Sequence, residues 1–226
     1  MFWQLLRIGH EQKFCIYNLH RKYKTMAKLY VKEYDVDSKL PWLYIILTKS
    51  PVDIVIFKPG DTQHTLMNPA KILPFLLDED VKIWGTVAVL LYLTQKFGNN
   101  LYHGQNADEK AKINSILYWT GGPFYRSAIT NFVRPQQSEP FYKLPGNDNQ
   151  LLIQHGKKNI TDHLDTLEKQ YFTKKKYVHG DAETIADFYI CNILMELERF
   201  KFDFSKWPKT EKWFHEMSQK VIVAMP

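Results

Sequence analysis

The chain has 226 residues, of which 45% are hydrophobic and 15% aromatic, so it can bury a substantial core in one domain or in two small ones. Its two cysteines, Cys15 and Cys191, lack a C-x-x-C spacing, which argues against a disulfide scaffold, a zinc site and a dithiol redox centre. The formal net charge of +6 is concentrated in residues 1–25, so nucleic-acid binding is not expected, and no apolar run approaches the roughly eighteen residues that span a bilayer.

Residues 1–26 form an extension that precedes the first expected strand. The segment is basic, poor in acids and apolar in patches such as Phe2–Trp3 and Phe14–Tyr17, and in this it resembles a mitochondrial presequence, although it has no serine and only two arginines. We therefore expect a mitochondrial location, with the cytoplasm as the alternative. The extension would target the chain, dock on its own body or a partner, or be left untranslated.

A first domain is predicted over residues 27–98, followed by a linker over residues 99–107. Strands alternate there with helices, which favours a mixed α/β sheet covered on both faces. The expected elements, in chain order, are a strand at 28–31, a helix at 41–48, a strand at 52–57, a proline-led strand with its hairpin partner, and a helix that ends at Phe97.

The stretch from Asn68 to Leu93 contains most of the local signals in this domain. Pro74 has no N–H to give to a sheet, so it must lie at the start or on the edge of its strand. Two short apolar runs flank the acidic turn Asp78–Asp80, a pattern typical of a hairpin. The hydroxyl of Thr86 can cap the helix that follows.

A second domain, residues 108–226, is predicted to be all helical. Gly121-Gly122-Pro123 should break its first helix, and residues 134–149 should form a long loop. The basic run Lys174–Lys176 indicates a solvated loop more than a phosphate-tracking surface. Thr184-Ile185-Ala186-Asp187 matches a capping box, in which the Asp187 carboxylate reaches back to the N–H of Thr184.

Taken in order, these elements resemble the glutathione S-transferase superfamily over roughly residues 28 to 217, most closely its theta-like branch. The resemblance rests on the NPxxxxP loop, the hairpin, the following helix and the G-D-x-x-T-x-A-D box that begins at Gly180. It implies a thioredoxin-like domain followed by an all-α domain, glutathione as co-substrate, no metal, and a homodimer.

The resemblance also assigns candidate glutathione ligands. Pro74 matches a cis proline of the family, and the backbone of Leu73 would pair with the cysteinyl part of glutathione like an added strand. Lys71 matches a lysine that meets the glycyl carboxylate, and His64 lies in the loop that usually supplies another ligand. Judged singly, Lys71 is better explained as an exposed loop cation and His64 as a polar loop residue.

The start of the helix after the hairpin departs from the family pattern. The family places an acid and a small hydroxyl residue there, which receive the ammonium and the carboxylate of the γ-glutamyl group, whereas this chain has Gly85 and Thr86. Thr86 can keep the carboxylate contact, and a helix N-terminus favours an anion. Losing the ammonium contact would cost about 1.5–3 kcal/mol, or about tenfold or more in affinity.

The residue that would activate the thiol is ambiguous. The theta-like pattern has a serine just before the first helix, which lowers the thiol pKa by donating to the thiolate. Ser38 falls on that position if one residue is deleted, whereas a gapless match places Asp37 there, and an ionised Asp37 would raise the thiol pKa. Tyr34 is the alternative donor. Asp37 and Ser38 could also simply cap the helix.

Two functional hypotheses follow from these residues. In the first, the chain is a structural or interaction module with weakened or lost glutathione binding, for example a subunit of a larger mitochondrial assembly that contacts other subunits through its extension. In the second, it is an active theta-like transferase that conjugates glutathione to small electrophiles. The electrophile would then occupy an apolar pocket, unless its residues simply pack the core: Trp42, Trp119, Phe124 and Tyr125. The departures at Gly85, at Ser38 and at Gly121–Pro123 favour the first.

Overall fold

The computed structural model describes residues 27–33, 35–58, 67–97, 103–137 and 148–223. The N-terminal extension, Tyr34 and His64 therefore lie outside the described residues. The chain divides into two compact units, one made of residues 1–100 with 220–226 and the other of residues 101–219.

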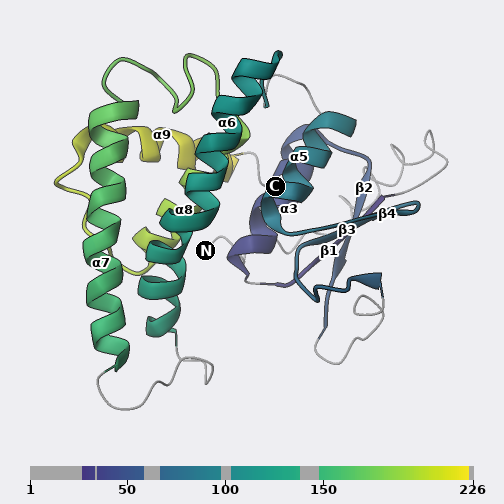
Figure 1. Ribbon diagram of the computed structural model, residues 1–226, viewed down its shortest axis with the longest axis horizontal. Coiled ribbons are helices and arrows are strands. Elements are labelled where there is room, and N and C mark those ends of the chain that lie inside the picture. Colours follow the sequence, from purple (N-terminus) through teal and green to yellow (C-terminus); the bar gives the residue numbers. More distant parts are fainter. Residues whose placement is uncertain (1–26, 34, 59–66, 98–102, 138–147, 224–226) are drawn as a thin grey trace. The chain divides into compact units, whose positions relative to one another are not determined.

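The first unit is built on a four-stranded sheet with the strand order β2-β1-β3-β4 (Figure 1). Strand β1 pairs with β2 in parallel and with β3 antiparallel, and β4 closes the hairpin with β3. The predicted mixed sheet is therefore confirmed. The described elements of this unit are β1 (Ala27–Val31), α3 (Val36–Thr48), β2 (Val52–Ile56), β3 (Phe75–Asp78), β4 (Val81–Trp84) and α5 (Thr86–Lys96).

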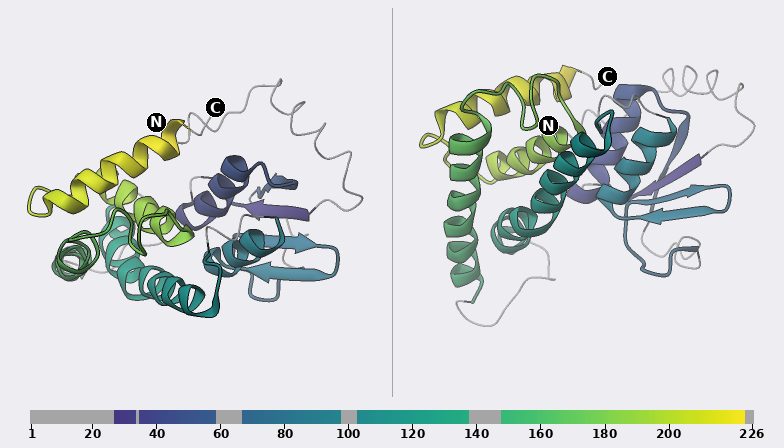
Figure 2. Two further views of the ribbon diagram at one scale, coloured as in Figure 1. Left: turned by 90° about the horizontal axis from the view of Figure 1, so that it is seen from above. Right: turned by 45° about the horizontal axis from the view of Figure 1, so that its top comes forward.

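The register of the β1–β3 pairing shows which side chains lie together on each face of the sheet. Leu29 of β1 lies opposite Leu76 of β3, and both are fully buried. Tyr30 lies opposite Phe75 on the other face, where their rings are 5.6 Å apart. Helices α3 and α5 pack beside each other and against the strands (Figure 2). The face of β1 that carries Leu29 is fully buried, whereas Lys28 on the Tyr30 face is exposed, so cover of both faces of the sheet stays a prediction.

Helix α3 begins five residues earlier than predicted. Its N-cap is Asp35, whose carboxylate accepts the backbone N–H of Ser38 at 3.0 Å, so the expectation that Asp37 and Ser38 form the cap is wrong. Pro41 was expected at the helix start, but it lies inside the helix. A proline there removes the hydrogen bond to the carbonyl four residues earlier, which is that of Asp37.

The second unit is all helical, as predicted. Its elements are α6 (Ala107–Trp119), η2 (Thr120–Phe124), η3 (Arg126–Val133), η4 (Arg134–Gln136), α7 (Asp148–Thr166), η6 (Leu167–Tyr171), α8 (Ile185–Arg199) and α9 (Pro208–Val223). Helix α7 runs alongside η3, so closely that a Cβ added at Gly156 would lie 2.9 Å from the carbonyl carbon of Asn131 (Figures 1 and 2).

The predicted break at Gly121–Pro123 is wrong. The chain stays helical through these residues, because α6 passes into the π-helical turns η2 and η3. The wider π spacing leaves room for the proline ring and uses i→i+5 bonds instead of i→i+4. The hydroxyl of Ser127 donates to the Pro123 carbonyl at 2.9 Å, which satisfies one acceptor of the altered segment.

The capping box at the start of α8 is confirmed. Asp187 is fully buried, and its carboxylate accepts the N–H of Thr184 at 2.8 Å, the hydroxyl of Thr184 at 2.9 Å and the N–H of Val178 at 2.9 Å. Burial nevertheless outweighs these donors and raises the pKa of Asp187 to about 6.

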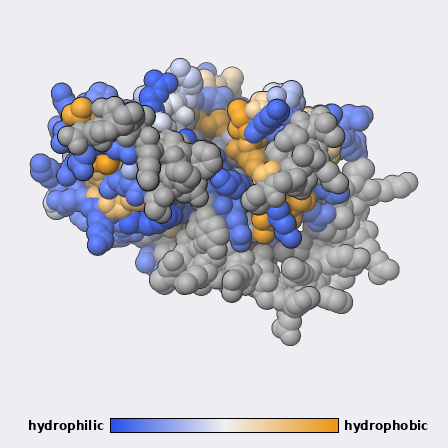
Figure 3. All heavy atoms as spheres, turned by 90° about the horizontal axis from the view of Figure 1, so that it is seen from below, coloured by the Kyte–Doolittle hydropathy of each residue, from blue (hydrophilic) through white to orange (hydrophobic). Residues whose placement is uncertain are grey.

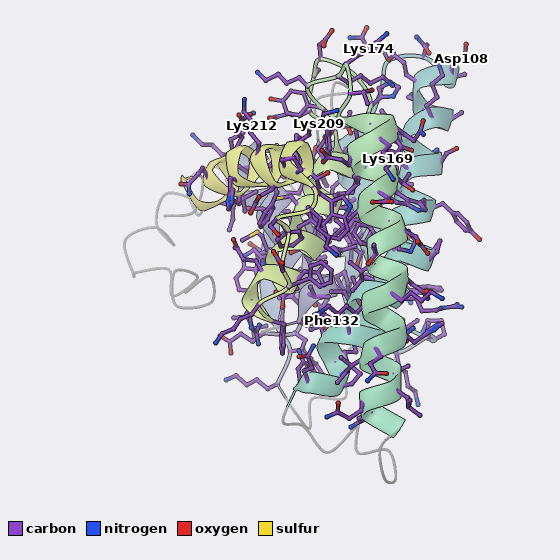
Figure 4. All side chains as sticks on the ribbon, turned by 90° about the vertical axis from the view of Figure 1, so that its left-hand side faces the viewer. Asp108, Phe132, Lys169, Lys174, Lys209 and Lys212 are labelled. Carbon is purple, nitrogen blue, oxygen red and sulfur yellow. The ribbon has the colours of Figure 1, made fainter. Side chains whose placement is uncertain are left out.

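The start of α9 is fixed by two acids of the α7–η6 segment. The Glu168 carboxylate accepts the backbone N–H groups of Lys209 and Thr210, and Asp165 accepts the indole N–H of Trp207 at 2.7 Å. Lys169, Lys209 and Lys212 lie near this junction (Figure 4). A carboxylate at a helix N-terminus satisfies its unpaired N–H groups, so these contacts set where α9 begins.

On the face drawn in Figure 3, most of the described side chains are hydrophilic, and hydrophobic ones gather in small groups between them. The run Lys174–Lys176 is exposed, as expected for a solvated loop. None of the helices in the described parts of the chain is long and apolar enough to cross a membrane.

Candidate functional site

The loop that enters β3 leaves one backbone unit open for pairing. The Leu73–Pro74 peptide bond is cis, and the Pro74 carbonyl accepts the N–H of Gly85 at 2.9 Å. Within the described residues, the N–H and C=O of Leu73 have no hydrogen-bond partner. The β1–β3 register, carried two residues further, would place Lys32 opposite Leu73, but the Lys32 N–H donates to the hydroxyl of Ser38.

Asn68 holds the shape of this loop. It is fully buried, its side-chain N–H₂ donates to the Ile72 carbonyl at 2.6 Å, and its own carbonyl accepts the N–H of Lys71 at 3.0 Å. Lys71 adopts a left-handed conformation with φ +54° and is exposed. The loop therefore presents the Lys71 side chain to solvent two residues before the open backbone of Leu73.

Gly85, the N-cap of α5, occupies a backbone conformation that L side chains rarely adopt. Its φ is +87° and its ψ 143°, and it offers no side-chain cap to the helix. An added Cβ would meet nothing within 4 Å, so the obstacle to a larger residue is the backbone alone. Holding a non-glycine residue in such a region costs about 1–3 kcal/mol.

The prediction that the Thr86 hydroxyl caps α5 is wrong, because this hydroxyl is directed to α3. It donates to the Asp37 carbonyl at 3.0 Å, which is the acceptor that Pro41 leaves open in α3. The Asp37 carboxylate lies 3.4 Å from the same hydroxyl oxygen. The start of α5 is therefore linked to the first turn of α3, with a negative charge beside it.

Ser38 is fully buried, and the one hydrogen of its hydroxyl is used. The oxygen accepts the N–H of Lys32 at 3.0 Å, and the hydrogen goes to the Asp35 carboxylate at 2.9 Å. A hydroxyl has one hydrogen to donate. Ser38 in this arrangement connects β1 to α3, and its hydrogen is directed to Asp35.

In the second unit, the π-helical turns bring three aromatic rings together. Trp119 and Phe124 are stacked with centroids 5.3 Å apart, and His163 of α7 lies 5.0 Å from Phe124. A spacing of five residues places two side chains on nearly the same face only where the helix is wider than α. Two of the predicted pocket residues are thus in contact, while Tyr125 instead accepts a hydrogen bond from Arg134.

His163 was not predicted from the sequence. Its Nδ1 accepts the indole N–H of Trp119 at 3.2 Å, which leaves the proton on Nε2, 3.3 Å from the Ser127 hydroxyl oxygen. Burial lowers the pKa of His163. Because its Nδ1 is already an acceptor and Ser127 donates to Pro123, this pair is not arranged as a nucleophile and its base.

Comparisons with known proteins show which proteins this chain is similar to. The sequence profile described as "Glutathione S-transferase, C-terminal domain" matches residues 129–220. Glutathione S-transferase D7 of Drosophila melanogaster is 27% identical over 155 residues, which cover 65% of this chain and 62% of the relative, so the match spans under two thirds of that protein. The structure of a diazinon-metabolizing glutathione S-transferase of the silkworm Bombyx mori superposes with a TM-score of 0.72 at 27% identity, covering 88% of this chain and 94% of that one.

The chain belongs to the glutathione S-transferase superfamily. Human glutathione S-transferase T1-1 shares the fold with a TM-score of 0.72 at 20% identity, over 86% of this chain and 84% of the human one.

Within this superfamily member, the structure brings Leu73, Pro74, Gly85 and Thr86 together through the Pro74–Gly85 hydrogen bond. The ligand roles assigned to Leu73, Lys71 and Thr86 stay predictions, and Tyr34 and His64 lie outside the described residues. A metal cluster of three or more His, Cys, Asp or Glu side chains does not occur in the described part of the chain.

Proposed function

We propose that this superfamily member binds glutathione weakly and does not activate its thiol, and that it works as a structural or interaction module. The observation that carries the proposal is the hydroxyl of Ser38, which is buried and donates its one hydrogen to Asp35. The thiolate is the reactive form of glutathione, and a donor is needed to stabilise it at neutral pH. A hydrogen committed to a carboxylate cannot serve that purpose.

The charge near the site supports the same conclusion. The Asp37 carboxylate lies next to Thr86, at the start of α5. A negative charge within about 4–6 Å of a thiol disfavours the thiolate and raises the thiol pKa. A ligand thiol placed that close to the Asp37 carboxylate would therefore ionise less readily.

Residual binding is supported by the loop before β3. The open N–H and C=O of Leu73 can pair with the cysteinyl backbone, and the exposed Lys71 can meet the glycyl carboxylate. Gly85 offers nothing to the γ-glutamyl ammonium, which removes about 1.5–3 kcal/mol of binding free energy. Glutathione should therefore bind about tenfold or more weakly than at a site with an acid in place of Gly85.

In the module role, the chain would contact other protein subunits through residues 1–26, for example within a mitochondrial assembly, or would form the homodimer typical of the superfamily. The basis for this part of the proposal is the presequence-like composition of the extension.

The second candidate is an active theta-like transferase. A cytoplasmic location is the alternative to the mitochondrial one. It is favoured by the curated relatives, which include Drosophila glutathione S-transferases D7 and D6 at 27% and 25% identity.

The two candidates differ in what Ser38 does. We would measure glutathione binding by calorimetry and turnover of a chlorodinitrobenzene-type electrophile for wild type and Ser38→Ala. The proposal expects weak binding and no turnover that depends on Ser38. Turnover that disappears in Ser38→Ala, with the fold retained by circular dichroism, would establish the transferase.

A matched pair of lysine variants tests whether the binding uses the proposed site. Lys71→Ala should weaken glutathione binding about tenfold, because a charge-assisted contact is lost, whereas exposed Lys82→Ala on β4 should not. Gly85→Glu is a poor test, because the positive φ would strain the fold whatever the acid contributed to binding.

A further inference from the structure

Two π-helical segments of the helical unit share one aromatic stack. The indole of Trp119, the last residue of α6, lies between the rings of Phe124 in η2 and Tyr171 in η6, with centroid distances of 5.3 Å and 6.0 Å. The same indole lies edge-on to His163 of α7, 5.6 Å away. Short π-helical segments inside α-helices are often found at functional sites. The contact between this stack and α7 therefore has more to explain than ordinary core packing.

The two ring nitrogens of His163 have opposite roles in this contact. Nδ1 accepts the indole N–H of Trp119 at 3.2 Å. The proton is therefore on Nε2, which lies 3.3 Å from the Ser127 hydroxyl oxygen, with the Pro123 carbonyl also nearby. A neutral imidazole has one acceptor and one donor, so the arrangement requires the neutral form.

A second proton would reverse the role of Nδ1. An imidazolium has a donor on each nitrogen, so its Nδ1–H would face the indole N–H, and neither group could accept. The rings of Trp119 and Phe124, 5.6 Å and 5.0 Å from the imidazole, would attract the cation. This attraction is weaker than the cost of two facing donors in a half-buried cluster. Burial has the same sign, because it lowers the pKa of His163.

The charges around the imidazole do not change this sign. Asp162, exposed on the same helix, favours the imidazolium, but its effect is smaller than that of burial. Tyr171 of η6 has a pKa that burial raises, so it stays neutral. The charged residues of η3, η4 and η6, which pack on α7, are exposed or bonded to other groups: Arg126, Arg134, Glu168 and Lys169.

We propose that His163 is a proton-operated latch, which holds the indole of Trp119 when neutral and releases it when protonated, while the helical unit stays folded. The inference stands apart from the proposed function, because no ligand and no residue of the loop before β3 takes part. In the released form the imidazole regains its usual pKa of about 6.5. Each pH unit below that value therefore raises the ratio of released to held indole by up to about tenfold, until the held form is protonated as well.

Hydrogen exchange of the indole N–H groups measures the released form. We would follow it by NMR in isotope-labelled full-length protein and express it as a protection factor, which removes the pH dependence of the intrinsic exchange rate. The Trp119 signal is identified by its loss in Trp119→Phe. Trp207 is a matched control in the same sample, because its indole N–H donates at 2.7 Å to Asp165, whose pKa is lowered by its hydrogen bond with Lys169.

The protection factor of Trp119 should fall by up to about tenfold per pH unit below about 6.5. That of Trp207 and the far-UV circular dichroism should stay constant over the same range. His163→Asn has a side-chain oxygen that can accept the indole N–H and no group that titrates, so the Trp119 protection factor should not depend on pH. His155→Asn, at an exposed position of the same helix, should keep the pH dependence of the wild type.

A wild-type protection factor of Trp119 that does not change with pH overturns the latch, and so does a fall that persists in His163→Asn. Parallel falls for Trp119 and Trp207 would show that the unit unfolds as a whole, which also overturns it. If His163→Asn does not fold, Trp119→Phe decides the question. Without the indole donor, the His163 ring should titrate at a higher pH than in the wild type, and an unchanged titration refutes the latch.

Discussion

The link between α3 and α5 can be tested by pairing Thr86→Val with Pro41→Ala. Thr86 is 6% exposed, and its hydroxyl satisfies the Asp37 carbonyl. Valine keeps the shape and removes this donor from the Asp37 carbonyl, which costs about 1–3 kcal/mol of unfolding free energy. For a chain of this length, that corresponds to a fall of about 2–12 °C in Tm.

Pro41→Ala restores a backbone N–H four residues after Asp37, so the carbonyl regains a helical partner. In that background, Thr86→Val should cost less than about 0.5 kcal/mol, which gives a coupling free energy of about 1–2 kcal/mol between positions 41 and 86. Urea denaturation followed by circular dichroism measures all four members of the cycle. Thr94→Val is the control, because the Thr94 hydroxyl donates to Leu91 within α5 and should cost the same in both backgrounds.

Equal losses for Thr86→Val with proline or with alanine at position 41 would refute the reasoning. They would show that the Asp37 carbonyl gains nothing from the helical N–H, so that Pro41 is not the reason why Thr86 points toward α3.

Three further predictions concern the helical unit. The raised pKa of Asp187 means that the folded state holds the proton more tightly than the unfolded state, so the stability that this proton contributes is full below about pH 4 and is lost as pH rises through about 6. Relative to Asp187→Asn, the wild type should lose up to about 3 kcal/mol of unfolding free energy across this range in urea titrations. A free-energy difference that stays constant with pH would contradict this prediction. The lowered pKa of His163 predicts the opposite sign, with stability falling as pH drops below about 6.5, and this part should vanish in His163→Gln but persist in the exposed control His155→Gln on the same helix. Gly156→Ala should cost about 1–3 kcal/mol of unfolding free energy, because its Cβ would press on the backbone of η3. Gly122→Ala, whose Cβ would meet nothing within 4 Å, should not destabilise the protein. Equal shifts in Tm for the two variants would show that close packing of α7 is not what requires glycine at position 156.

Structural features that depend on residues close together in sequence were predicted correctly. The turn Asp78–Asp80 between two apolar runs gave the β3–β4 hairpin, and Pro74 before β3 gave the strand entry. The capping box at Thr184 and Asp187 was equally readable, because its two residues are three apart and interact within one helical turn.

The start of α3 was not predictable in the same way. Proline usually marks a first helical position, so Pro41 suggested a helix that begins there. What lets the helix extend back to Val36 is the Asp35 cap together with a hydroxyl from Thr86, 49 residues away in sequence. A donor so distant has no local signature. The state of Ser38 depends on the same turn, which is why its hydroxyl could be placed only from the structure.

The aromatic cluster escaped prediction for a different reason. Periodicity at 3.6 residues separates Trp119 from Phe124 and gives no cause to associate either with His163. Gly121–Pro123 is a valid helix-breaking signal for an α-helix, but a π-helical turn tolerates it.

The π-helical stretch also bears on how relatives of this chain should be aligned. A π turn holds more residues than an α turn over the same height, so a residue can be added to or removed from the helix between Trp119 and Arg134 while both ends keep their places. A length difference in this region would normally be assigned to a loop, with the gap moved to residues 134–149. The structure indicates that such a gap belongs inside the helix, and misplacing it would shift every residue comparison along the helical stretch that contains Phe124 and Ser127.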